Sequence, residues 1–525
     1  MLPVSRNTFS ARSRTPVIFK RGAAFSSGSI AVAGIVLRKF RRTIAPFTLR
    51  RICRATYGGF VSRRQPACNN NPGSVYNFDL LEIALPDLPR VVIVGGGFGG
   101  LYAARALAGA AVRITIIDRR NYNLFRPMLY QVATGLLSAD EISGPLRSIF
   151  SRRPDVEVLL DEVVGVDVEA RRVQLRDYSL PYDFLIMATG IQYNYFGHDE
   201  WRQFAPGLAS LEDADVIRGK VLLAFERAER LAAFGRAAPE VIQPLLTFVL
   251  VGAGTVGVEM ASTLAEMSRE ALAHDFRHID VRSTQILLYE AAPRVLPTYP
   301  ESLSAKAQLY LEKLGVKVRT NTRVTLVDNE GIVAGGERVF AGTVLWSAGV
   351  VASPAGRWLG AATDKAGRVI VNSDLSVPDH PEVFAIGDTA HVVASSRNLL
   401  GFRQKGQMEL PGVAQPAIQE GQYVAKVIRR RIRGIKPPPP FWYWDKGDLA
   451  IVGRTYAVAD LRFVRFAGFP GWLIWAGVHI YFLIGFANRF FVLLQWSLSF
   501  FTKRRQVRIF PSQTEWAERE TSAGP

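Results

Sequence analysis

Three glycines directly after an apolar strand are the first residues of this chain whose spacing predicts chemistry. Gly95, Gly97 and Gly100 follow the run RVVIV and open an Ala- and Leu-rich segment. Asp118 ends the next apolar run, RITIID. Small residues let the backbone approach a pyrophosphate at a helix N-terminus, and the acid accepts hydrogen bonds from ribose hydroxyls. Because strand, turn, helix and acid occur together, the segment predicts a dinucleotide-binding fold.

The same pattern occurs a second time in the middle of the chain. Gly252, Gly254 and Gly257 follow the strand TFVLV. Glu290 ends the strand QILLYE, and a carboxylate there repels a 2′-phosphate, which favours NADH over NADPH. The nearby Arg294 keeps NADPH open as an alternative, and a solvated strand end is the alternative for Glu290.

Two later segments indicate which nucleotide each fold binds. FLIMATG, which ends at Gly190, and VFAIGD, which ends at Asp388, are apolar strands followed by small residues. The second offers a carboxylate where a ribityl or phosphate chain would pass. Such a late glycine-aspartate pair suits only a long nucleotide that reaches across the chain. FAD is therefore predicted in the first fold.

These motifs predict an α/β protein with two Rossmann-like domains of the two-dinucleotide-binding flavoprotein type. Short alternating strands follow each glycine turn, so the repeat covers most of each half. The basic, proline-rich run RRRIRGIKPPPP marks a boundary near residue 440. We expect a basic extension over 1–87, the FAD-binding domain over 88–205 and 341–440, the NADH-binding domain over 206–340, a C-terminal membrane-anchoring helical segment over 441–510 and a tail over 511–525.

Composition excludes several functional classes. The net charge of the 525 residues is +18, but residues 1–78 hold fourteen Lys or Arg and no acid, so the body is close to neutral. Nucleic-acid binding is therefore not expected. The basic start resembles a targeting segment in composition, with a disordered tail or a misassigned start as alternatives. Both cysteines, Cys53 and Cys68, lie in it, which excludes a redox disulfide or a Cys-ligated metal in the core, and the six histidines show no metal-ligand spacing.

An apolar stretch at 469–501 is a feature that soluble flavin chemistry does not need. The 23 residues at 466–488 are uncharged, and about 20 are enough to span a bilayer. However, Asn488, Gln495 and Ser499 lie on one face of the second half, and a basic cluster follows. This pattern favours helices that lie in the membrane interface over a span, with a buried core helix as a third alternative. The electron acceptor is therefore expected in lipid.

Residues from about 88 to 510 resemble the type II NADH dehydrogenases, which are single-subunit, non-proton-pumping NADH:quinone oxidoreductases. The resemblance lies in DRRNYNLFRPMLYQVATG, GAGTVGVE and AIGD, and more specifically in AQPAIQEGQ, DKGDLAIVGR and GFANRFFVLLQW. It implies a membrane-bound respiratory enzyme that uses FAD to oxidise NADH and reduce a membrane quinone. The implied contacts are Gly95, Gly97, Gly100, Asp118 and Asp388 for FAD, Gly252, Gly254, Gly257 and Glu290 for NADH, and Arg119, Ala188, Thr189, Gly190, Gly387, Ala348 and Gly349 as further cofactor contacts.

The resemblance also implies a quinone site. Gln415 and Gln419 are four residues apart, so on a helix both amides face one way and can reach one ligand. Similar proteins place this pair beside the quinone headgroup, Glu259 close to the nicotinamide and flavin rings, and Lys446 near the flavin or a quinone oxygen. Solvated amides and an exposed turn lysine are the alternatives. Hydride transfer needs alignment rather than an acid-base triad, so Glu259 and the two glutamines are expected to position substrates and handle protons.

Two other functions fit the motifs. One is a flavin reductase that passes electrons from NAD(P)H to a protein acceptor such as ferredoxin, and the other is a membrane-tethered NADH-binding flavoprotein with a role in signalling or assembly. The resemblance favours the cytoplasmic face of a bacterial inner membrane. A mitochondrial inner membrane and a transmembrane helix near 471–488 are the alternatives, and a homodimer is left open.

Overall fold

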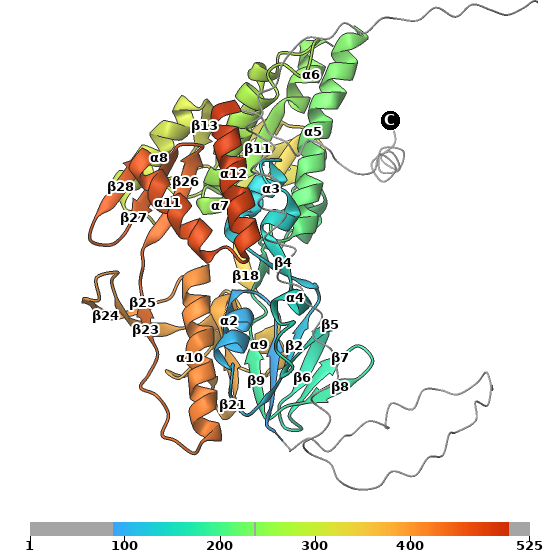
Figure 1. Cartoon of the computed structure of the whole chain (residues 1–525). Helices are drawn as coiled ribbons and strands as arrows, with labels where there is room; N and C mark the ends of the chain where they lie inside the picture. Colours follow the sequence, from blue (N-terminus) through green and yellow to red (C-terminus); the bar gives the residue numbers. More distant parts are fainter. Residues whose placement is uncertain (1–87, 236–237, 503–525) are drawn as a thin grey trace, which may run out of the picture. The chain divides into compact units, whose positions relative to one another are not determined.

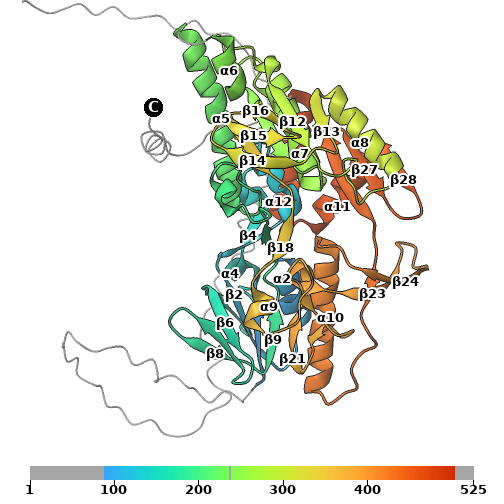
Figure 2. The same ribbon diagram turned by 180° about the vertical axis from the view of Figure 1, so that it is seen from behind.

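Two mainly parallel sheets organise the part of the chain that the computed structural model describes, residues 88–235 and 238–502 (Figures 1 and 2). The first sheet has the order β20 (Ser376–Val377), β21 (His380–Ala385), β9 (Phe184–Met187), β1 (Arg90–Val94), β2 (Arg113–Asp118) and β5 (Val156–Leu160). The second has the order β13 (Val316–Arg319), β12 (Gln285–Tyr289), β11 (Thr247–Val251) and β17 (Thr343–Trp346). The prediction of an α/β protein with two such units is confirmed.

The strand before each glycine turn lies inside its sheet, between two parallel neighbours. Val94 at the end of β1 pairs with Ile117 and Met187, and Val251 at the end of β11 pairs with Trp346. Both strands are almost wholly buried, as expected for parallel strands covered on both faces. Each glycine turn therefore begins where the carboxyl ends of neighbouring strands meet, which is where open α/β sheets bind ligands.

Helices and small layers of two or three strands surround the two sheets (Figure 1). The helices up to residue 432 are α2 (Phe98–Ala106), α3 (Leu129–Ala133), α4 (Leu146–Ile149), α5 (Leu211–Ala233), α6 (Pro239–Leu245), α7 (Thr255–Glu266), α8 (Glu301–Lys313), α9 (Ala355–Trp358) and α10 (Ala414–Ile432). The three-stranded layers are β6 (Val163–Asp167), β7 (Arg172–Leu175) and β8 (Ser179–Pro181), then β14 (Val324–Asp328), β15 (Gly331–Ala334) and β16 (Glu337–Phe340), and β23 (Val393–Arg397) with β24 (Arg403–Glu409) and β25 (Trp442–Trp444). Three two-stranded pairs are β3 (Tyr122–Leu124) with β4 (Ser143–Pro145), β10 (Ile191–Tyr193) with β18 (Val350–Ala352), and β19 (Val369–Ile370) with β22 (Ala390–His391).

One expected domain boundary is placed too early. β17 pairs in parallel with β11, so it belongs to the second sheet, although residue 341 was expected to begin the second part of the FAD-binding domain. The boundary therefore falls after Trp346. The expected extension at 1–87 and tail at 511–525 lie outside the described residues.

The C-terminal part begins with the antiparallel layer β26 (Asp448–Gly453), β27 (Tyr456–Asp460) and β28 (Arg465–Gly468) and continues into α11 (Phe469–Phe482) and α12 (Phe486–Thr502). α11 ends inside the 471–488 segment that was the alternative candidate for a membrane span. No helix within the described residues combines the length and the apolar character needed to cross a bilayer. Trp475 of α11 and Val492 of α12 are buried in the same hydrophobic core as α3, α5 and α7.

The polar stripe of α12 faces the protein. The Asn488 amide donates to the carbonyl oxygen of Ser143 at 3.1 Å, and the Trp496 indole donates to Gln131 Oε1 at 2.8 Å. The Gln495 amide donates to the carbonyl oxygen of Leu136 at 3.4 Å. The opposite side of α12 carries exposed apolar residues: Phe490, Phe491, Leu493, Leu494, Leu498, Phe500 and Phe501.

A close helix contact yields a test of the packing around the first sheet. In α10, a Cβ added at Gly421 would lie 2.4 Å from the carbonyl oxygen of Gly99 in α2. We expect Gly421→Ala to lower the free energy of unfolding by about 1–3 kcal/mol, because two packed helices would have to separate. Gly477→Ala in α11 is the matched control, since nothing lies within 4 Å of its added Cβ. Equal unfolding free energies for the two variants in urea titrations would contradict this packing.

Candidate functional site

The first glycine of each turn contacts the carboxyl end of the neighbouring strand. Gly95 has a φ of +108°, and a Cβ there would lie 2.2 Å from the carbonyl oxygen of Ala188. Gly252 has a φ of +99°, and its Cβ would lie 2.7 Å from the backbone nitrogen of Ala348. Gly349 follows with a φ of +68°. Only glycine combines such conformations with this close approach. Gly95 thus meets Ala188 and Gly252 meets Ala348, and all four are expected cofactor residues.

The second glycine of each turn leaves open space at a helix N-terminus. Gly97 and Gly254 are the N-caps of α2 and α7, and no atom lies within 4 Å of a Cβ added to either. By contrast, a Cβ at Gly100 or Gly257 would lie 1.9 Å from the carbonyl oxygen of the first glycine of its own turn. The third glycine thus serves packing, and the second leaves room for a phosphate at the helix N-terminus.

The two acids occupy equivalent positions. Asp118 Oδ2 accepts a 2.6 Å hydrogen bond from the backbone of Gly96, and Glu290 Oε2 accepts one of 2.7 Å from Ala253. Burial raises the pKa of Asp118, and its hydrogen bond from the backbone of Gly96 opposes this shift. Arg119 is exposed beside it. Each acid therefore closes its glycine turn, and in each one oxygen bonds the turn itself.

A third group of expected residues joins the carboxyl ends of β9 and β21. The backbone of Gly190 donates to Thr389 Oγ1 at 2.9 Å, and the Thr189 hydroxyl bonds those of Ser353 and Thr389. Asp388 is in the same turn, and burial raises the pKa of its carboxyl, while Arg126 and Arg368 oppose the shift. The two strand ends that the sequence analysis assigned to one long nucleotide are thus adjacent.

These residues fit FAD in the first fold and NADH in the second. Each fold has a glycine turn with open space at its helix N-terminus and an acid at the end of the second strand. Asn123 donates to the carbonyl oxygen of Gly96 at 2.7 Å. Its buried Oδ1 has no hydrogen-bond partner among the described residues, which leaves an acceptor beside the FAD turn.

The sequence analysis missed Glu420 of α10. This side chain is 1% exposed, and its Oε2 accepts a 2.5 Å hydrogen bond from the backbone of Gly387, beside Asp388. Burial raises the pKa of Glu420 to about 8. Glu420 is three residues after the apolar Ala417 and four before the apolar Val424. This helical spacing predicts that its carboxyl group lies on the buried face of the helix.

The two glutamines of α10 differ in their surroundings. Both ends of the Gln419 amide are bonded to the backbone of Trp444, at 3.0 and 2.9 Å. Gln415 Oε1 is buried and has no hydrogen-bond partner in the described part of the chain. Gln419 therefore holds the strand before the DKG turn, and Gln415 retains a carbonyl oxygen for a ligand.

Lys446 lies between aromatic rings of two segments. Its Nζ is 5.1 Å from the ring centroid of Trp444 and 5.1 Å from that of Phe482 at the end of α11. Burial lowers the pKa of Lys446. Arg462, also missed from the sequence, fixes this turn because its guanidinium bonds three carboxylates, those of Asp445, Asp448 and Asp460.

Glu259 lies in α7 and is 5% exposed. Its carboxyl group accepts a hydrogen bond from the backbone of Ile451 in β26, and burial raises its pKa well above the ordinary value. Burial therefore favours the neutral form of this carboxyl group. Burial raises the pKa of Tyr299, and the nearby Asp448 and Glu259 raise it further.

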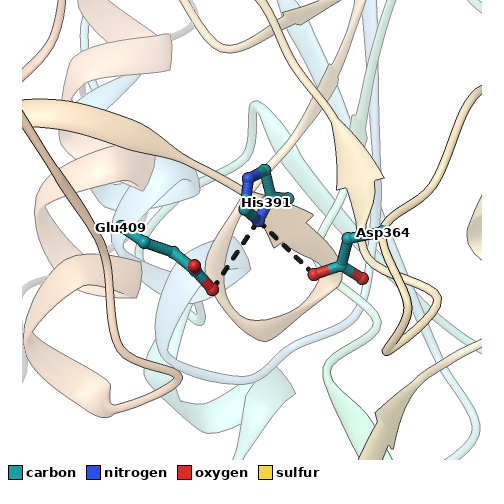
Figure 3. A group of neighbouring side chains, drawn as sticks. All are labelled: Asp364, His391 and Glu409. Carbon is teal, nitrogen blue, oxygen red and sulfur yellow. Dashed lines mark ion pairs between the residues drawn. The ribbon is translucent and has the colours of Figure 1, made fainter.

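A cluster of Asp364, His391 and Glu409 has metal-ligand composition (Figure 3). The guanidinium of Arg368 lies among these three side chains: it is 2.6 Å from Asp364 and 3.2 Å from His391, and it also pairs with Glu409. A protein cation therefore already neutralises the carboxylates, and the cluster carries no argument for a metal.

The raised pKa of Glu420 has a consequence for stability. Between about pH 5 and pH 8 the folded state keeps a proton that the unfolded chain releases, so the stability conferred by this group falls as the pH rises. We expect Glu420→Gln to become more stable than the wild type across this range, by up to about 1.4 kcal/mol per pH unit. Urea titrations at pH 5, 6, 7 and 8 test this, with exposed Glu312→Gln as the control. A constant difference from the wild type would contradict it.

Comparisons with known proteins agree with this geometry. Residues 89–421 match the pyridine nucleotide-disulphide oxidoreductase family. A type II NADH:quinone oxidoreductase of Mycobacterium tuberculosis is 42% identical over 447 residues, which cover 82% of this chain and 92% of that protein. A mitochondrial internal alternative NAD(P)H-ubiquinone oxidoreductase of Arabidopsis thaliana is 27% identical over 80% of this chain and 86% of its own.

Among solved structures, NDH2 of Plasmodium falciparum in complex with NADH has the same fold. Its TM-score is 0.69 at 21% identity, and the match covers 81% of this chain and all of that one. Fold, motif order and relatives agree, and the chain therefore belongs to the type II NADH:quinone oxidoreductases, within the pyridine nucleotide-disulphide oxidoreductase family.

Proposed function

We propose that this enzyme, which oxidises NADH and reduces quinone without pumping protons, works on a membrane surface, with its quinone bound between α10 and α11. One observation carries the proposal: Gln415 retains a buried, unpartnered carbonyl oxygen, and Lys446, two residues after the backbone that Gln419 holds, contacts α11. One continuous group of residues thus offers polar contacts for a quinone headgroup and adjoins the apolar helices α11 and α12.

On the NADH side, the residues of this chain bind and orient. The Gly252 to Gly257 turn accepts the pyrophosphate at the N-terminus of α7, and Glu290 is in place for a ribose. The buried carboxyl group of Glu259 accepts a hydrogen bond from the backbone of Ile451, and burial favours its neutral form, which adds no negative charge to the site. FAD, when bound, takes the hydride of NADH and passes both electrons to the quinone.

On the quinone side, Gln415 and Lys446 orient the headgroup. The unpartnered Oε1 of Gln415 can accept from a hydroxyl of the quinol as it forms, and the Nζ of Lys446 can donate to a quinone oxygen, which gains charge as it is reduced. The lowered pKa of Lys446 makes its ammonium a better proton donor than an exposed lysine. Arg462 keeps the turn rigid, so the position of Lys446 does not depend on a flexible loop.

The apolar face of α11 and α12 is proposed to rest on the lipid. Phe501 is 82% exposed and Tyr481 70% exposed, and they belong to a set of large apolar residues on the outer side of both helices. Contiguous patches of this kind mark interaction sites, and helices of this type lie in the membrane interface. An isolated interfacial helix turns its polar face toward water. In α12 this polar face is bonded to the rest of the protein, so its apolar face is left for the lipid.

We propose the cytoplasmic face of a bacterial inner membrane as the location. The 42% identity with a mycobacterial enzyme supports a bacterial setting, whereas the plant mitochondrial relative is more distant at 27%. An NADH-oxidising site has to face the compartment that supplies NADH.

Gln415→Ala and Lys446→Met test the quinone site. We expect each to slow the quinone half-reaction by about 10- to 100-fold, because each removes one hydrogen bond that strengthens as charge develops. The NADH half-reaction should stay within twofold of the wild type. Stopped-flow absorbance of the flavin, first with NADH and then with a short-chain quinone, measures both steps.

Two controls come from the same helix. Gln422→Ala and Lys426→Met change exposed residues of α10 and should leave both half-reactions unchanged. Equal slowing of the NADH half-reaction in Gln415→Ala would overturn the site assignment. Transfer of electrons to a ferredoxin in preference to quinone would overturn the function.

Charged substitutions on the apolar face of α12 test the membrane contact. We expect the double variant Phe491→Asp, Leu494→Asp to bind vesicles of mixed phosphatidylglycerol and phosphatidylethanolamine at least about tenfold more weakly, because two apolar side chains no longer enter the interface. Phe340→Asp is the control, since Phe340 is equally exposed on β16, outside this face. Sedimentation with vesicles measures binding, and unchanged binding of the double variant would contradict the proposed face.

A further inference from the structure

Quinone reduction also needs a route by which protons from the medium reach the site. NADH, one proton and a quinone give NAD⁺ and a quinol, so each turnover takes up one proton from the medium. Glu259 is buried, so once its carboxyl group has released a proton it must take up the next one by way of water. The inference that follows rests on the proposed function, since only a reaction that consumes protons needs such a route.

Four residues on one face of α7 and its continuation can carry protons. Glu259, Thr263, Glu266 and Glu270 are four, three and four residues apart, so they follow one another along one side of the helix. Glu270 lies in the π-helical turn Met267–Ala271, directly after α7. Turns of this type are frequent at functional sites, because they change the direction in which side chains point.

Exposure increases along this stripe. Glu259 and Thr263 are each 5% exposed, whereas Glu266 and Glu270 are half-buried. Thr263, Glu266 and Glu270 all line one open cavity of about 50 Å³ between α3, α7, the β26–β27 turn and the helices α11 and α12. The stripe therefore starts at Glu259, which is bonded to β26, the strand that follows the Lys446 turn, and ends at the wall of an open cavity.

The cavity reaches the immediate surroundings of Glu259. Ile451, whose backbone donates to the Glu259 carboxyl group, is part of the cavity wall. Thr263 Oγ1, also in the wall, donates to the backbone carbonyl oxygen of Glu259 at 2.5 Å. Ile451 thus lies between the cavity and the carboxyl group of Glu259, and Thr263 lies between the cavity and the Glu259 backbone.

The cavity wall also carries hydrogen-bond donors that the protein leaves unused. Trp475 is 1% exposed, and its indole Nε1 has no hydrogen-bond partner within the described residues. The same is true of Nε of Arg454, although the rest of this residue is engaged. Buried water is held by such groups, since each water molecule needs two to four polar partners.

Other charged groups face the two ends of the stripe. Around Glu259 these are Tyr299, Asp448 and, further out, Arg462. At the outer end the Arg454 backbone donates to Glu266 at 2.6 Å, and its guanidinium lies 3.0 Å from Glu270. Tyr310 of α8 lies near the same two glutamates. Arg454 thus keeps both outer carboxyl groups at the cavity wall.

We propose that Thr263, Glu266 and Glu270, with water in this cavity, form the route by which protons from the medium reach Glu259. A proton from the medium binds Glu270 or Glu266 and passes through water and the Thr263 hydroxyl to Glu259. Glu259 gives its proton to a quinone oxygen and takes up the next one from this route. One proton enters for each quinol formed, and no residue of the route is oxidised or reduced.

Thr263→Val tests the route, with Ser262→Ala as the matched control. Both hydroxyls bond the backbone carbonyl oxygen of Glu259, Ser262 at 3.0 Å, but only Thr263 lines the cavity. Glu266→Gln and Glu270→Gln are the further variants, since each keeps the shape and an acceptor oxygen. The full-length enzyme with bound FAD is used, and flavin content and thermal unfolding are measured for every variant.

Both half-reactions are followed by stopped flow in H₂O and D₂O from pH 6 to pH 9. We expect Thr263→Val to slow the quinone half-reaction by about tenfold and to raise its solvent isotope effect, because proton supply becomes rate-limiting. The glutamine variants should lose rate progressively as the pH rises. The NADH half-reaction and Ser262→Ala should match the wild type.

A structural defect would slow the reaction without changing its solvent isotope effect. Variants that reduce quinone at the rate and isotope effect of Ser262→Ala would overturn the proton route and leave the proposed function intact. If the wild-type enzyme itself failed to pass electrons to quinone, the proposed function would fail. The result therefore separates the two proposals.

Discussion

The buried hydrogen bond between Glu420 and the backbone of Gly387 fixes the relation of α10 to the first sheet. It joins the turn that carries Asp388 to the helix that carries Gln415 and Gln419. The close contact of α10 with α2 brings the same helix against the first glycine turn. A helix far along the chain thereby becomes part of the FAD site. Its polar residues are positioned by packing, with no need for a loop.

From α10 the contacts continue in one direction toward the C-terminal helices. Gln419 holds the backbone of Trp444, the next turn presents Lys446, and Lys446 lies on the ring of Phe482. α12 is in turn tied to the loop after α3 by hydrogen bonds from its polar side chains. The apolar segment is therefore an integral part of the fold. A shift of these helices on a membrane would therefore change the position of Lys446.

The sequence predicted what depends on local pattern. Both glycine turns, the two acids and the late Gly387–Asp388 turn lie where the strand and helix patterns placed them, because turn geometry is determined within a few residues. Partners distant in sequence were not predictable. The spacing of Gln415 and Gln419 correctly suggested one helix face, yet Gln419 is bonded to a strand 25 residues later. The polar stripe of α12 was visible, but nothing local indicates that it faces carbonyl groups of residues 136–143.

Glu259 and Glu420 show why a raised pKa alone does not assign a role. Both carboxyl groups are buried, and burial raises the pKa of each. Glu420 lies between α10 and the Gly387 turn, where its hydrogen bond serves the architecture. Glu259 borders a wall residue of a cavity lined by hydroxyl and carboxyl side chains. A proton held without access to water can only stabilise one protonation state, whereas a proton with access can be exchanged in every turnover. Access to the cavity, more than the size of the pKa shift, supports the proposal that Glu259 takes part in the reaction and that Glu420 serves the architecture.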